Sequence, residues 1–534
     1  MKTVLAICLA ALVCVHSAAA QQVVGWRGDG TGRYPAATPP VEWAKDKNIV
    51  WASKMPSWSN ATPIIVGNRI YLCSEPSDIV CVSAADGKIL WQKSNEYFDA
   101  LPPEELPKAQ EVKKQADALA AKIRPLQDEF NKLNHQINKR NELTKKIAEL
   151  PKQIEALPEQ LKAREGELAK QNDELAKAPD NADLKKKVDE LQKQVNELLG
   201  KQEGAPKQLE KAIEELKALP EEAELKTKTE DTRKQIDALR NERQPLSIYD
   251  LPPKEGTTGY ATATPVSDGK VVYVLSGNGV AACYDLDGNR KWIRMLAKPT
   301  NGWGHSSSPL LIGDKLIVHI HSVMALNAQT GETLWTANGT GSRFGTPVHA
   351  KVGDVDVVAT PEGDVVRVSD GKILARLQTK LEFNAPIVAD GTIYFIQHGG
   401  KGFKMPDEPA DELKLEPLWT TKPKGDRYYA SPLYHDGIIY GITQGTVLSA
   451  IDAKTGEVIY EQNLDVKSTA YSSLTLAGGY IYASGENGAT VVFEAGREYK
   501  EVKRNELEGF RTCPVFAGKL MYVRGLNHLY CISE

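Results

Sequence analysis

A structural unit recurs along most of this 534-residue chain, and the repeat limits the fold more than any other feature. Each unit opens with a small residue and proline, continues with short runs of alternating apolar residues, and closes at an Asp-Gly or Thr-Gly turn. The eight openings are Thr62-Pro63, Thr264-Pro265, Ser308-Pro309, Thr346-Pro347, Ala385-Pro386, Ser431-Pro432, Ser473-Leu474 and Cys513-Pro514. From Pro309 onward they lie about 38 to 46 residues apart, the length of one four-stranded propeller blade.

The closing segments support the same interpretation. Tight Asp-Gly and Thr-Gly turns precede a large aromatic residue, which we expect to pack between neighbouring blades. These closures are Asp86-Gly87 before Trp91, Asp287-Gly288 before Trp292, Thr330-Gly331 before Trp335 and Thr455-Gly456 before Tyr460. The fourth unit departs from the pattern, because Ala375 stands at its aromatic position.

The last unit has no closing strand of its own, because the chain ends shortly after Tyr530. A strand of the missing type is predicted near the start, over Asn48 to Lys54, with Trp51 as its aromatic residue. If this strand completes the eighth blade, the ring closes and no sheet edge stays exposed. The sequence therefore predicts an all-β eight-bladed propeller, with blade 1 and the closing strand in residues 21–100 and blades 2 to 8 in residues 251–534.

Residues 101–250 differ in composition and predict an inserted α-helical coiled-coil hairpin. From residue 101 to 248 about 40% of positions are charged, and Phe130 is the only aromatic residue. Two apolar runs step by four and three, as a coiled-coil seam requires, with turn chemistry at Pro179-Asp180-Asn181 between them. The runs are Leu119, Ile123, Leu126, Phe130, Leu133 and Ile137, then Leu184, Val188, Leu191, Val195 and Leu198.

Five prolines keep a second arrangement of this insertion open. Proline kinks or breaks a long helix, so a bundle of four or five shorter helices is the alternative. These prolines are Pro125, Pro151, Pro158, Pro206 and Pro220. In either arrangement the insertion is a candidate partner-binding arm, a device for dimerisation or a lid.

The first 20 residues have the pattern of a secretory signal peptide. Lys2 precedes an apolar run from Val4 to Val15, and Ala18-Ala19-Ala20 forms a small-residue cleavage site. We expect residues 1–20 to be removed and the mature protein to be periplasmic or secreted. No later stretch reaches the ~20 apolar residues that a transmembrane helix needs, so we do not expect the protein to span a membrane.

Export leads to an oxidising compartment, where cysteines can pair. Cys73 and Cys81 flank a predicted hairpin turn at Pro76-Ser77-Asp78 and could form a disulfide. The alternative is that both are buried free thiols within strands. The balance of 66 Lys and Arg against 70 Asp and Glu gives a formal charge of −4, so the composition does not indicate nucleic acid as a partner.

These motifs resemble those of the secreted pyrroloquinoline-quinone-like (PQQ-like) propeller repeat proteins. The resemblance rests on Trp26-Arg27-Gly28, Pro39-Pro40, Trp43, Asn48 to Trp51, Thr62-Pro63 and the repeated closures, and it covers nearly the whole chain outside the insertion. It implies an eight-bladed propeller but no single chemistry. Such proteins range from quinone-dependent alcohol and sugar dehydrogenases to an outer-membrane-assembly scaffold without a cofactor.

The dehydrogenases of this group are similar in using calcium beside the quinone, a catalytic aspartate and, in many cases, two adjacent cysteines. This sequence has no adjacent cysteine pair. About 41 residues per blade also leave little room for the long loops that build such a site. We therefore expect no cofactor and assign no catalytic residue, with PQQ and calcium kept as the lesser alternative.

Residues just before each innermost strand are expected to approach the central channel, where propellers commonly bind ligands. An aromatic and cationic ring there could hold a planar, sugar-like or anionic ligand by stacking and charge-assisted hydrogen bonds. The candidate ligand-binding residues are Trp58, Tyr260, His305, Arg343, Asn384, Arg427, Tyr429, Tyr471 and Arg511. Trp303, Phe344, Phe383, Tyr428 and Phe510 occupy similar positions. The alternative is that these side chains only fill and stiffen the channel.

Other motifs favour structural roles. His319 and His321 share a strand face and could hold a metal, but the sequence offers no third ligand, so no metal site is predicted. Asp285 to Asn289 resembles part of a calcium loop yet lies at a blade turn. Gly28 to Gly32 lacks the lysine and the strand-to-helix setting of a phosphate loop.

The sequence as a whole favours an exported, non-enzymatic propeller that acts as a binding or scaffold module, with the coiled-coil arm for partner interaction. The partner would be a cell-envelope protein or a small ligand. The alternative function is a divergent PQQ-dependent oxidoreductase acting on alcohols or sugars, and a third is a structural spacer in the cell envelope.

Overall fold

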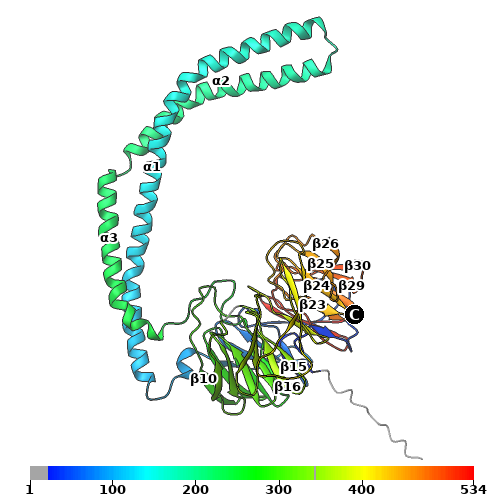
Figure 1. Ribbon diagram of the computed structural model, residues 1–534. Helices are drawn as coiled ribbons and strands as arrows, with labels where there is room; N and C mark the ends of the chain where they lie inside the picture. The colour runs from blue at the N-terminus through cyan, green and yellow to red at the C-terminus, as the bar shows by residue number, and fades with distance from the viewer. Residues whose placement is uncertain (1–21, 342–343) are drawn as a thin grey trace, which may run out of the picture. The chain divides into compact units, whose positions relative to one another are not determined.

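Each small-residue and proline opening directly precedes the innermost strand of a blade, as at Pro63 before β3 and Pro265 before β7. Proline suits this position because it fixes φ and donates no backbone hydrogen bond where the chain enters a sheet. The computed structural model describes residues 22–341 and 344–534, so the predicted signal peptide at 1–20 lies outside the described residues. Within the described part the strands form eight sheets, which are the blades of a propeller (Figure 1).

Blades 1 to 4 follow one another along the chain, and each is an antiparallel sheet of four strands. Blade 1 consists of β3 (Ile64–Val66), β4 (Arg69–Ser74), β5 (Asp78–Ser83) and β6 (Ile89–Ser94). Blade 2 consists of β7 (Val266–Ser267), β8 (Val271–Leu275), β9 (Val280–Asp285) and β10 (Arg290–Met295). Blade 3 consists of β11 (Leu310–Ile312), β12 (Lys315–His319), β13 (Val323–Asn327) and β14 (Thr333–Ala337). Blade 4 consists of β15 (Val348–Val352), β16 (Val355–Ala359), β17 (Asp364–Arg367) and β18 (Ile373–Arg376).

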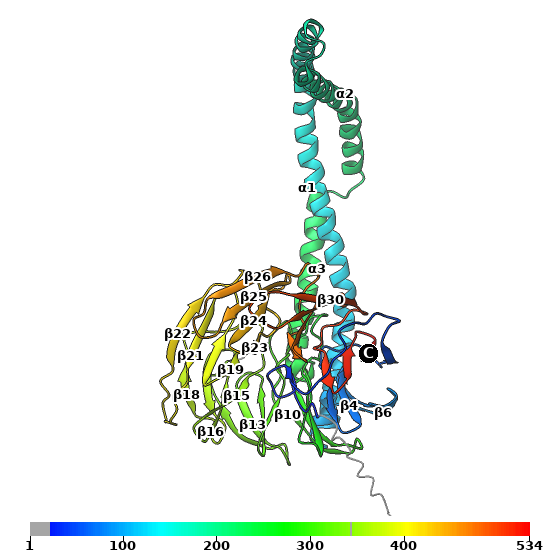
Figure 2. The same ribbon diagram turned by 90° about the vertical axis from the view of Figure 1, so that its right-hand side faces the viewer.

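Blades 5 to 8 repeat this plan (Figure 2). The inner strands of blades 2 to 6 contact one another in succession. Blade 5 consists of β19 (Ile387–Ala389), β20 (Thr392–Phe395), β21 (Gly400–Lys404) and β22 (Glu416–Thr421). Blade 6 consists of β23 (Leu433–His435), β24 (Ile438–Ile442), β25 (Val447–Asp452) and β26 (Val458–Asn463). Blade 7 consists of β27 (Thr475–Ala477), β28 (Tyr480–Ser484), β29 (Ala489–Glu494) and β30 (Glu501–Glu506). Blade 8 consists of β31 (Val515–Ala517), β32 (Leu520–Arg524), β33 (His528–Ile532) and β2 (Ile49–Lys54).

The order of strands in blade 8 confirms the predicted ring closure. Strand β2 pairs antiparallel with β33, which places Trp51 opposite Cys531 and Ala52 opposite Tyr530. A strand from the start of the described chain therefore completes the last blade and covers the edge of β33. Blade 8 is also joined to blade 1, because the Cys513 amide before blade 8 donates a hydrogen bond to Oγ1 of Thr62 before blade 1 (3.1 Å).

The closing aromatic residues seal the seams between blades, as predicted. In blade 1, Trp91 Nε1 donates to the Leu286 carbonyl of blade 2 (3.1 Å), and the ring covers Gly288. Trp51, Trp292 and Trp335 repeat this contact at their own seams. Trp419 does the same for blade 5, where the sequence pattern did not indicate a closure because no Asp-Gly or Thr-Gly turn precedes this residue.

Residues 22–34 cross the channel on one side of the propeller. Val23 bridges to Ile65 of blade 1, and β1 (Arg33–Tyr34) adds to β27 of blade 7 as a parallel fifth strand. Between them, Arg27 is almost fully buried and donates to the carbonyls of Pro432 (2.8 Å) and Leu474 (2.9 Å). Segment 22–34 therefore ties inner strands of distant blades together.

Residues 107–250 form a separate compact unit made of helices. Helix α1 (Leu106–Lys177) runs through Pro125, Pro151 and Pro158, and the predicted turn separates it from α2 (Ala182–Lys217). Asn181 caps α2 by accepting from the amides of Asp183 and Leu184 (both 3.1 Å). Helix α3 (Glu222–Arg243) follows a break at 218–221, and the short 3-10 helices η1 (Tyr97–Ala100) and η2 (Gln244–Tyr249) flank the three.

The insertion is therefore a hairpin whose returning arm is broken once, rather than a bundle of four or five helices. Leu150 and Leu157 of α1 pack with Ala205 of α2, and Arg140 of α1 donates to the Pro220 carbonyl at the break (3.0 Å). The supercoiled geometry of a coiled coil stays a prediction. In the described part of the chain, no helix combines the length and the apolar character needed to cross a membrane.

Candidate functional site

A cavity of about 580 Å³ lies within the propeller unit, lined by the loops that precede the inner strands. We number the positions in these loops backward from the proline of each opening, or from Leu474 in blade 7. Two of these positions line the cavity. The residue three before lines the cavity in all eight blades, and the residue one before lines it in seven. Side chains alternate between the two faces of an extended chain, so the positions between them point into the blades instead.

The position directly before the proline forms a floor of hydroxyl groups that joins the blades. At five of the eight junctions, the backbone amide at this position donates a hydrogen bond to the side chain at the same position of the next blade. The bonds run from Thr264 to Ser308, Ser308 to Thr346, Ala385 to Ser431, Ser431 to Ser473 and Cys513 to Thr62, at 3.0 to 3.1 Å. Serine and threonine fit here because they satisfy buried amides without bulk.

The position three before the proline builds an aromatic wall over four consecutive blades. Phe344 stacks on Phe383 (5.6 Å between ring centroids), and Phe383 meets Tyr429 edge to face (4.7 Å). Tyr429 in turn stacks on Tyr471 (5.0 Å). Each of these rings is partly exposed, so the wall offers aromatic surface to the cavity. We call these four residues the aromatic arc.

Arg511 continues the arc, and its charge is already paired. Its guanidinium lies 5.8 Å from the Tyr471 ring and 6.0 Å from the Trp58 ring, and its Nε donates to Glu486 Oε1 (2.7 Å). Arg427 is exposed and donates to the Tyr429 hydroxyl (3.3 Å), a hydrogen bond that raises the pKa of the Arg427 guanidinium. The side chain of Arg511 is thereby fixed, whereas that of Arg427 extends into solvent at the rim.

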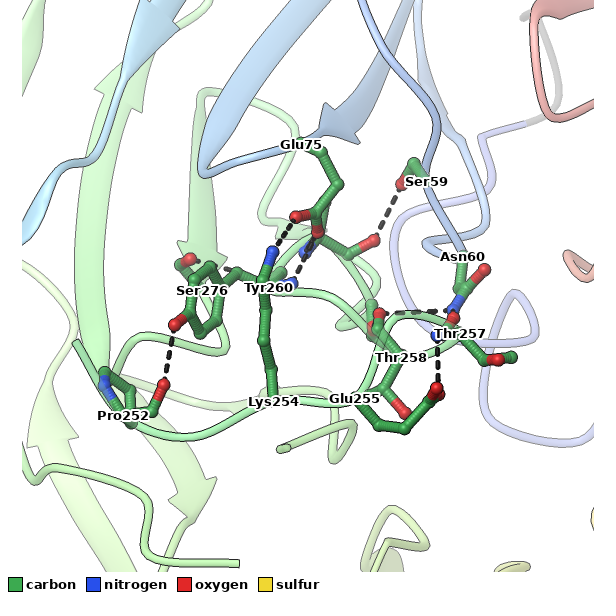
Figure 3. Close-up of polar contacts among 12 residues, drawn as sticks. Ser59, Asn60, Glu75, Pro252, Lys254, Glu255, Thr257, Thr258, Tyr260 and Ser276 are labelled. Carbon is green, nitrogen blue, oxygen red and sulfur yellow. Dashed lines mark hydrogen bonds and ion pairs between the residues drawn. The ribbon is translucent and has the colours of Figure 1, made fainter. Parts of the chain in front are cut away.

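The loop 252–262 forms another part of the wall, and a buried carboxylate holds it (Figure 3). Glu75, in the turn between β4 and β5, accepts hydrogen bonds from the amides of Tyr260 and Ala261, and pairs with Lys254 Nζ (2.7 Å). Asn60 Nδ2 donates to the Thr257 carbonyl (2.8 Å), which also accepts from Arg511 (3.1 Å). Blade 1 thus positions this loop and its cavity-lining residues Glu255, Thr257 and Thr258.

Trp26 separates the cavity from a second one of about 270 Å³ and lines both. The second cavity is bounded by residues 24–31 and by inner strands of blades 2 to 6. The Arg27 guanidinium lies 5.4 Å from the Trp26 ring. The Arg27 guanidinium donates to two carbonyls of inner-strand segments, so this residue anchors the segment. Burial lowers its pKa. Trp26 and Arg27 therefore close the channel below the aromatic arc.

The comparisons with known proteins bear on the fold. A family model described as outer membrane protein assembly factor BamB matches residues 320–534. Quinohemoprotein alcohol dehydrogenase from Comamonas testosteroni is similar over 96% of this chain and 80% of its own, at 9% identity and TM-score 0.53. A europium-containing methanol dehydrogenase is similar over 95% of this chain and 90% of its own, at 11% identity and TM-score 0.51. The chain has a β-propeller fold of the quinoprotein type.

This result confirms the predicted resemblance to PQQ-like propellers at the level of the fold. BamB from Moraxella catarrhalis was also found, with 15% identity and TM-score 0.41 over 51% of this chain and 83% of its own. No curated protein sequence matched the chain.

The quinoprotein-type fold raises the question of whether the residues fit a quinone and calcium. A planar ring could stack on the aromatic arc. However, the residues described include no group of three or more His, Cys, Asp or Glu able to hold a metal ion. The two carboxylates lining the cavity come from separate loops, Glu255 before blade 2 and Glu382 before blade 5. The donor set therefore does not fit a calcium ion beside a quinone.

The propeller brings some of the predicted ligand-binding residues together and buries others. Arg427, Tyr429, Tyr471 and Arg511 line the cavity, and Trp58 contacts Arg511 from behind. Tyr260, His305 and Asn384 are buried and do not line it. Arg343 lies outside the described residues.

The buried members of this set have structural contacts instead. The Tyr260 hydroxyl donates to the Pro252 carbonyl (2.6 Å), and Asn384 Nδ2 donates to the Ile396 carbonyl (2.9 Å). Burial lowers the pKa of His305 to about 4. His305 lies four positions before its proline and Asn384 lies two before its own. Side chains at these even-numbered positions point into a blade, because side chains alternate along an extended chain.

Several lining residues were missed from the sequence, although the repeat contained their signal. Asn60, Thr262 and Ser306 stand three positions before a proline, where Tyr429 and Arg511 stand in other blades. The floor hydroxyls were recognised as repeat openings but not as lining groups. Trp26 and Thr257 gave no local signal, because tertiary contacts bring them to the cavity.

The cysteine and histidine pairs also have structural explanations. A Cys73–Cys81 disulfide is not formed, since both thiols are free and buried. The register pairs Cys73 with Ile79 and Cys81 with Tyr71, so the two cysteines are diagonal neighbours, roughly 7–8 Å apart and too distant to bridge. His319 and His321 bind separate carbonyls, those of Gly341 and Lys298.

Proposed function

We propose that the protein is an exported binding propeller, in which the cavity beside the aromatic arc holds a ligand and the helical insertion engages a partner. The cavity carries this proposal. Its volume of about 580 Å³ is typical of a small-molecule site, and its aromatic surface and fixed polar groups are the means by which such sites bind and orient ligands. The residues that contact the ligand would be Tyr429, Tyr471, Arg427 and the rim of loop 252–262.

A scaffold role is supported by the family model, since the name outer membrane protein assembly factor describes a protein that works with partners. The insertion adds a surface in which both signs of charge are mixed. Such a helical surface suits recognition by complementary charge, or self-association. On this proposal the partner is a cell-envelope protein, consistent with the predicted signal peptide.

Native mass spectrometry tests the ligand-binding part. Protein purified from its source cells is expected to carry a small-molecule adduct that the Tyr471→Ala variant loses. Leu418→Ala is the matched control, because Leu418 is 40% exposed on β22 and does not line the cavity. An adduct retained by Tyr471→Ala, or no adduct in the wild type, would contradict ligand binding in the cavity.

Deleting residues 104 to 245 tests the arm. The deletion is expected to abolish recovery of the envelope partner or to lower the oligomeric state, measured by affinity purification and by light scattering after gel filtration. The charge-altered full-length chain with Lys185, Lys186 and Lys187 replaced by Glu keeps the helices and should weaken the same association. Unchanged association in both proteins would rule out the arm's role.

An oxidoreductase is the second candidate, because the propellers of two alcohol dehydrogenases share this fold. Titration with quinone and calcium, followed by ultraviolet-visible spectra and dye reduction with alcohols and sugars, tests it. A spectral shift with dye reduction would support the oxidoreductase and overturn the non-enzymatic proposal. No shift and no reduction would eliminate the quinone-dependent form.

A further inference from the structure

The cavity has a lining that is aromatic and polar with no aliphatic side chain among the described residues. Its apolar surface comes from Trp26, Trp303 and the aromatic arc. Apart from Gly345 and Cys513, every other described lining residue carries a hydroxyl, amide, carboxylate or guanidinium group. A site for a lipid or an aliphatic side chain would bury such a ligand against Leu, Ile, Val or Met, so this lining suits a different chemistry.

We infer that the cavity binds a neutral carbohydrate, an inference that rests on the proposed ligand-binding function. A sugar ring has flat faces of C–H groups, which stack on aromatic rings, and an edge of hydroxyl groups that both donate and accept hydrogen bonds. The aromatic arc supplies the stacking surface. Thr257, Thr258 and Asn301 supply amide and hydroxyl groups around the same cavity.

The charge of the lining favours a neutral sugar over an anionic one. Among the described lining residues, Glu255 and Glu382 balance Arg427 and Arg511. The Arg511 guanidinium is moreover engaged by Glu486 and by the Thr257 carbonyl. The exposed Arg427 guanidinium is the one lining guanidinium left for a bidentate bond among the described residues. Strong recognition of carboxylates and phosphates uses clusters of such groups, so an anion would gain little from this site.

Trp303 gives the cavity a second stacking surface. Its side chain is 64% exposed at the rim, which is unusual for a residue whose area is normally buried. It lies between Gly302 and Gly304, and its amide is held by Asn301 Oδ1 (3.0 Å). The flanking glycines leave the ring free to reorient, so Trp303 can cover the exposed face of a sugar held in the cavity.

Isothermal titration calorimetry on the full chain tests the inference, with a β-1,4-linked glucose hexamer and an N-acetylglucosamine hexamer as neutral probes and a galacturonic acid hexamer as the anionic probe. At least one neutral hexamer is expected to bind, with the same affinity in 50 and 500 mM NaCl. Trp303→Ala is expected to weaken this binding about tenfold. Leu418→Ala should bind as the wild type, and Tyr471→Phe should retain binding that Tyr471→Ala loses.

Two results would overturn the assignment of a neutral carbohydrate. One is binding of the anionic hexamer alone with loss of affinity in high salt, and the other is neutral binding that Trp303→Ala and Tyr471→Ala leave unchanged. The exposed position of Trp303 keeps the test valid if Tyr471→Ala misfolds. If no hexamer binds while the native adduct is lost in Tyr471→Ala, the carbohydrate assignment fails and the proposed ligand-binding function stands. If there is also no adduct, both fail.

Discussion

At the scale of single residues, the seam between blades depends on a close approach of glycine to an aromatic ring. Gly288 has φ 86°, and a Cβ added there would lie 2.8 Å from the Trp91 ring. Gly437 also has a positive φ (75°), but an added Cβ would meet nothing within 4 Å. The two positions therefore separate the cost of the backbone conformation from the cost of the collision.

We predict that Gly288→Ala destabilises the propeller more than Gly437→Ala. Both variants strain the backbone, by about 1 kcal/mol. Only Gly288→Ala also forces Trp91 away from its seam, which adds about 1–3 kcal/mol. Urea unfolding of both variants measures the difference. Equal losses would show that the Trp91 contact adds nothing to stability.

The free energy of unfolding is expected to depend on pH because two histidines, His305 and His319, are buried. Burial lowers the pKa of His305 and His319 to about 4, below the value of about 6.5 in an unfolded chain. Nδ1 of His319 and Nε2 of His305 have no hydrogen-bond partner among the described residues. The unfolded chain then binds more protons than the folded one between pH 6.5 and 4, so the free energy of unfolding falls as the pH falls through this window.

We expect each of these histidines to lower the free energy of unfolding by about 2 kcal/mol between pH 7 and pH 5. His319→Gln keeps a donor for the Gly341 carbonyl and should remove its share of the loss. The exposed His398→Gln is the control and should show the wild-type loss. Urea unfolding at the two pH values checks this, and a His319→Gln protein that loses as much as the wild type would refute it.

At the scale of elements, the cavity depends on how loop 252–262 is held. Glu75 does for this loop what a neighbouring strand does elsewhere, namely accept its backbone hydrogen bonds. Its buried carboxylate accepts hydrogen bonds from two backbone amides and pairs with the ammonium group of Lys254. No sequence motif predicts this contact, since Glu75 and Tyr260 lie 185 positions apart. The loop was predicted to approach the channel, but what fixes it required the tertiary structure.

We predict that Glu75→Gln loosens this loop. The amide keeps the size of the side chain but loses the charge that pairs with Lys254, and stability should fall by about 1–3 kcal/mol. Hydrogen exchange at Thr257 to Ala261 should become faster while the other blades keep their protection. Glu498→Gln at an exposed position is the control. Unchanged exchange in the Glu75→Gln protein would show that other contacts hold the loop.

At the scale of the whole molecule, the ring makes its seams equivalent. Trp51 seals blade 8 to blade 1 by donating to the Ala84 carbonyl (3.3 Å), as Trp292 seals blade 2 to blade 3 by donating to the Ala328 carbonyl (2.9 Å). The two contacts span similar lengths of chain, 33 and 36 residues. Trp51, however, belongs to blade 8 only because β2 pairs with β33 from the other end of the propeller. In a closed ring both seams must open when the molecule unfolds.

We therefore predict that Trp51→Ala and Trp292→Ala destabilise the propeller by similar amounts, about 2–4 kcal/mol each. Leu90→Ala, on the 49% exposed side chain of β6, should cost less than about 0.5 kcal/mol. Thermal and urea unfolding compare the three proteins. If Trp51→Ala alone kept wild-type stability, the closing strand would not contribute to the folded ring.

The sequence by itself determined the eight blades, the closing strand and the helical insertion, because turns, strand alternation and helical periodicity are local properties. It also placed Tyr429, Tyr471 and Arg511 at the cavity, since they precede inner strands. The tertiary structure decided which neighbours point inward, that Cys73 and Cys81 stay apart, and that Trp26 and Arg27 close the channel. These outcomes depend on register, on alternation at the opening prolines and on contacts between distant segments, which local patterns do not encode.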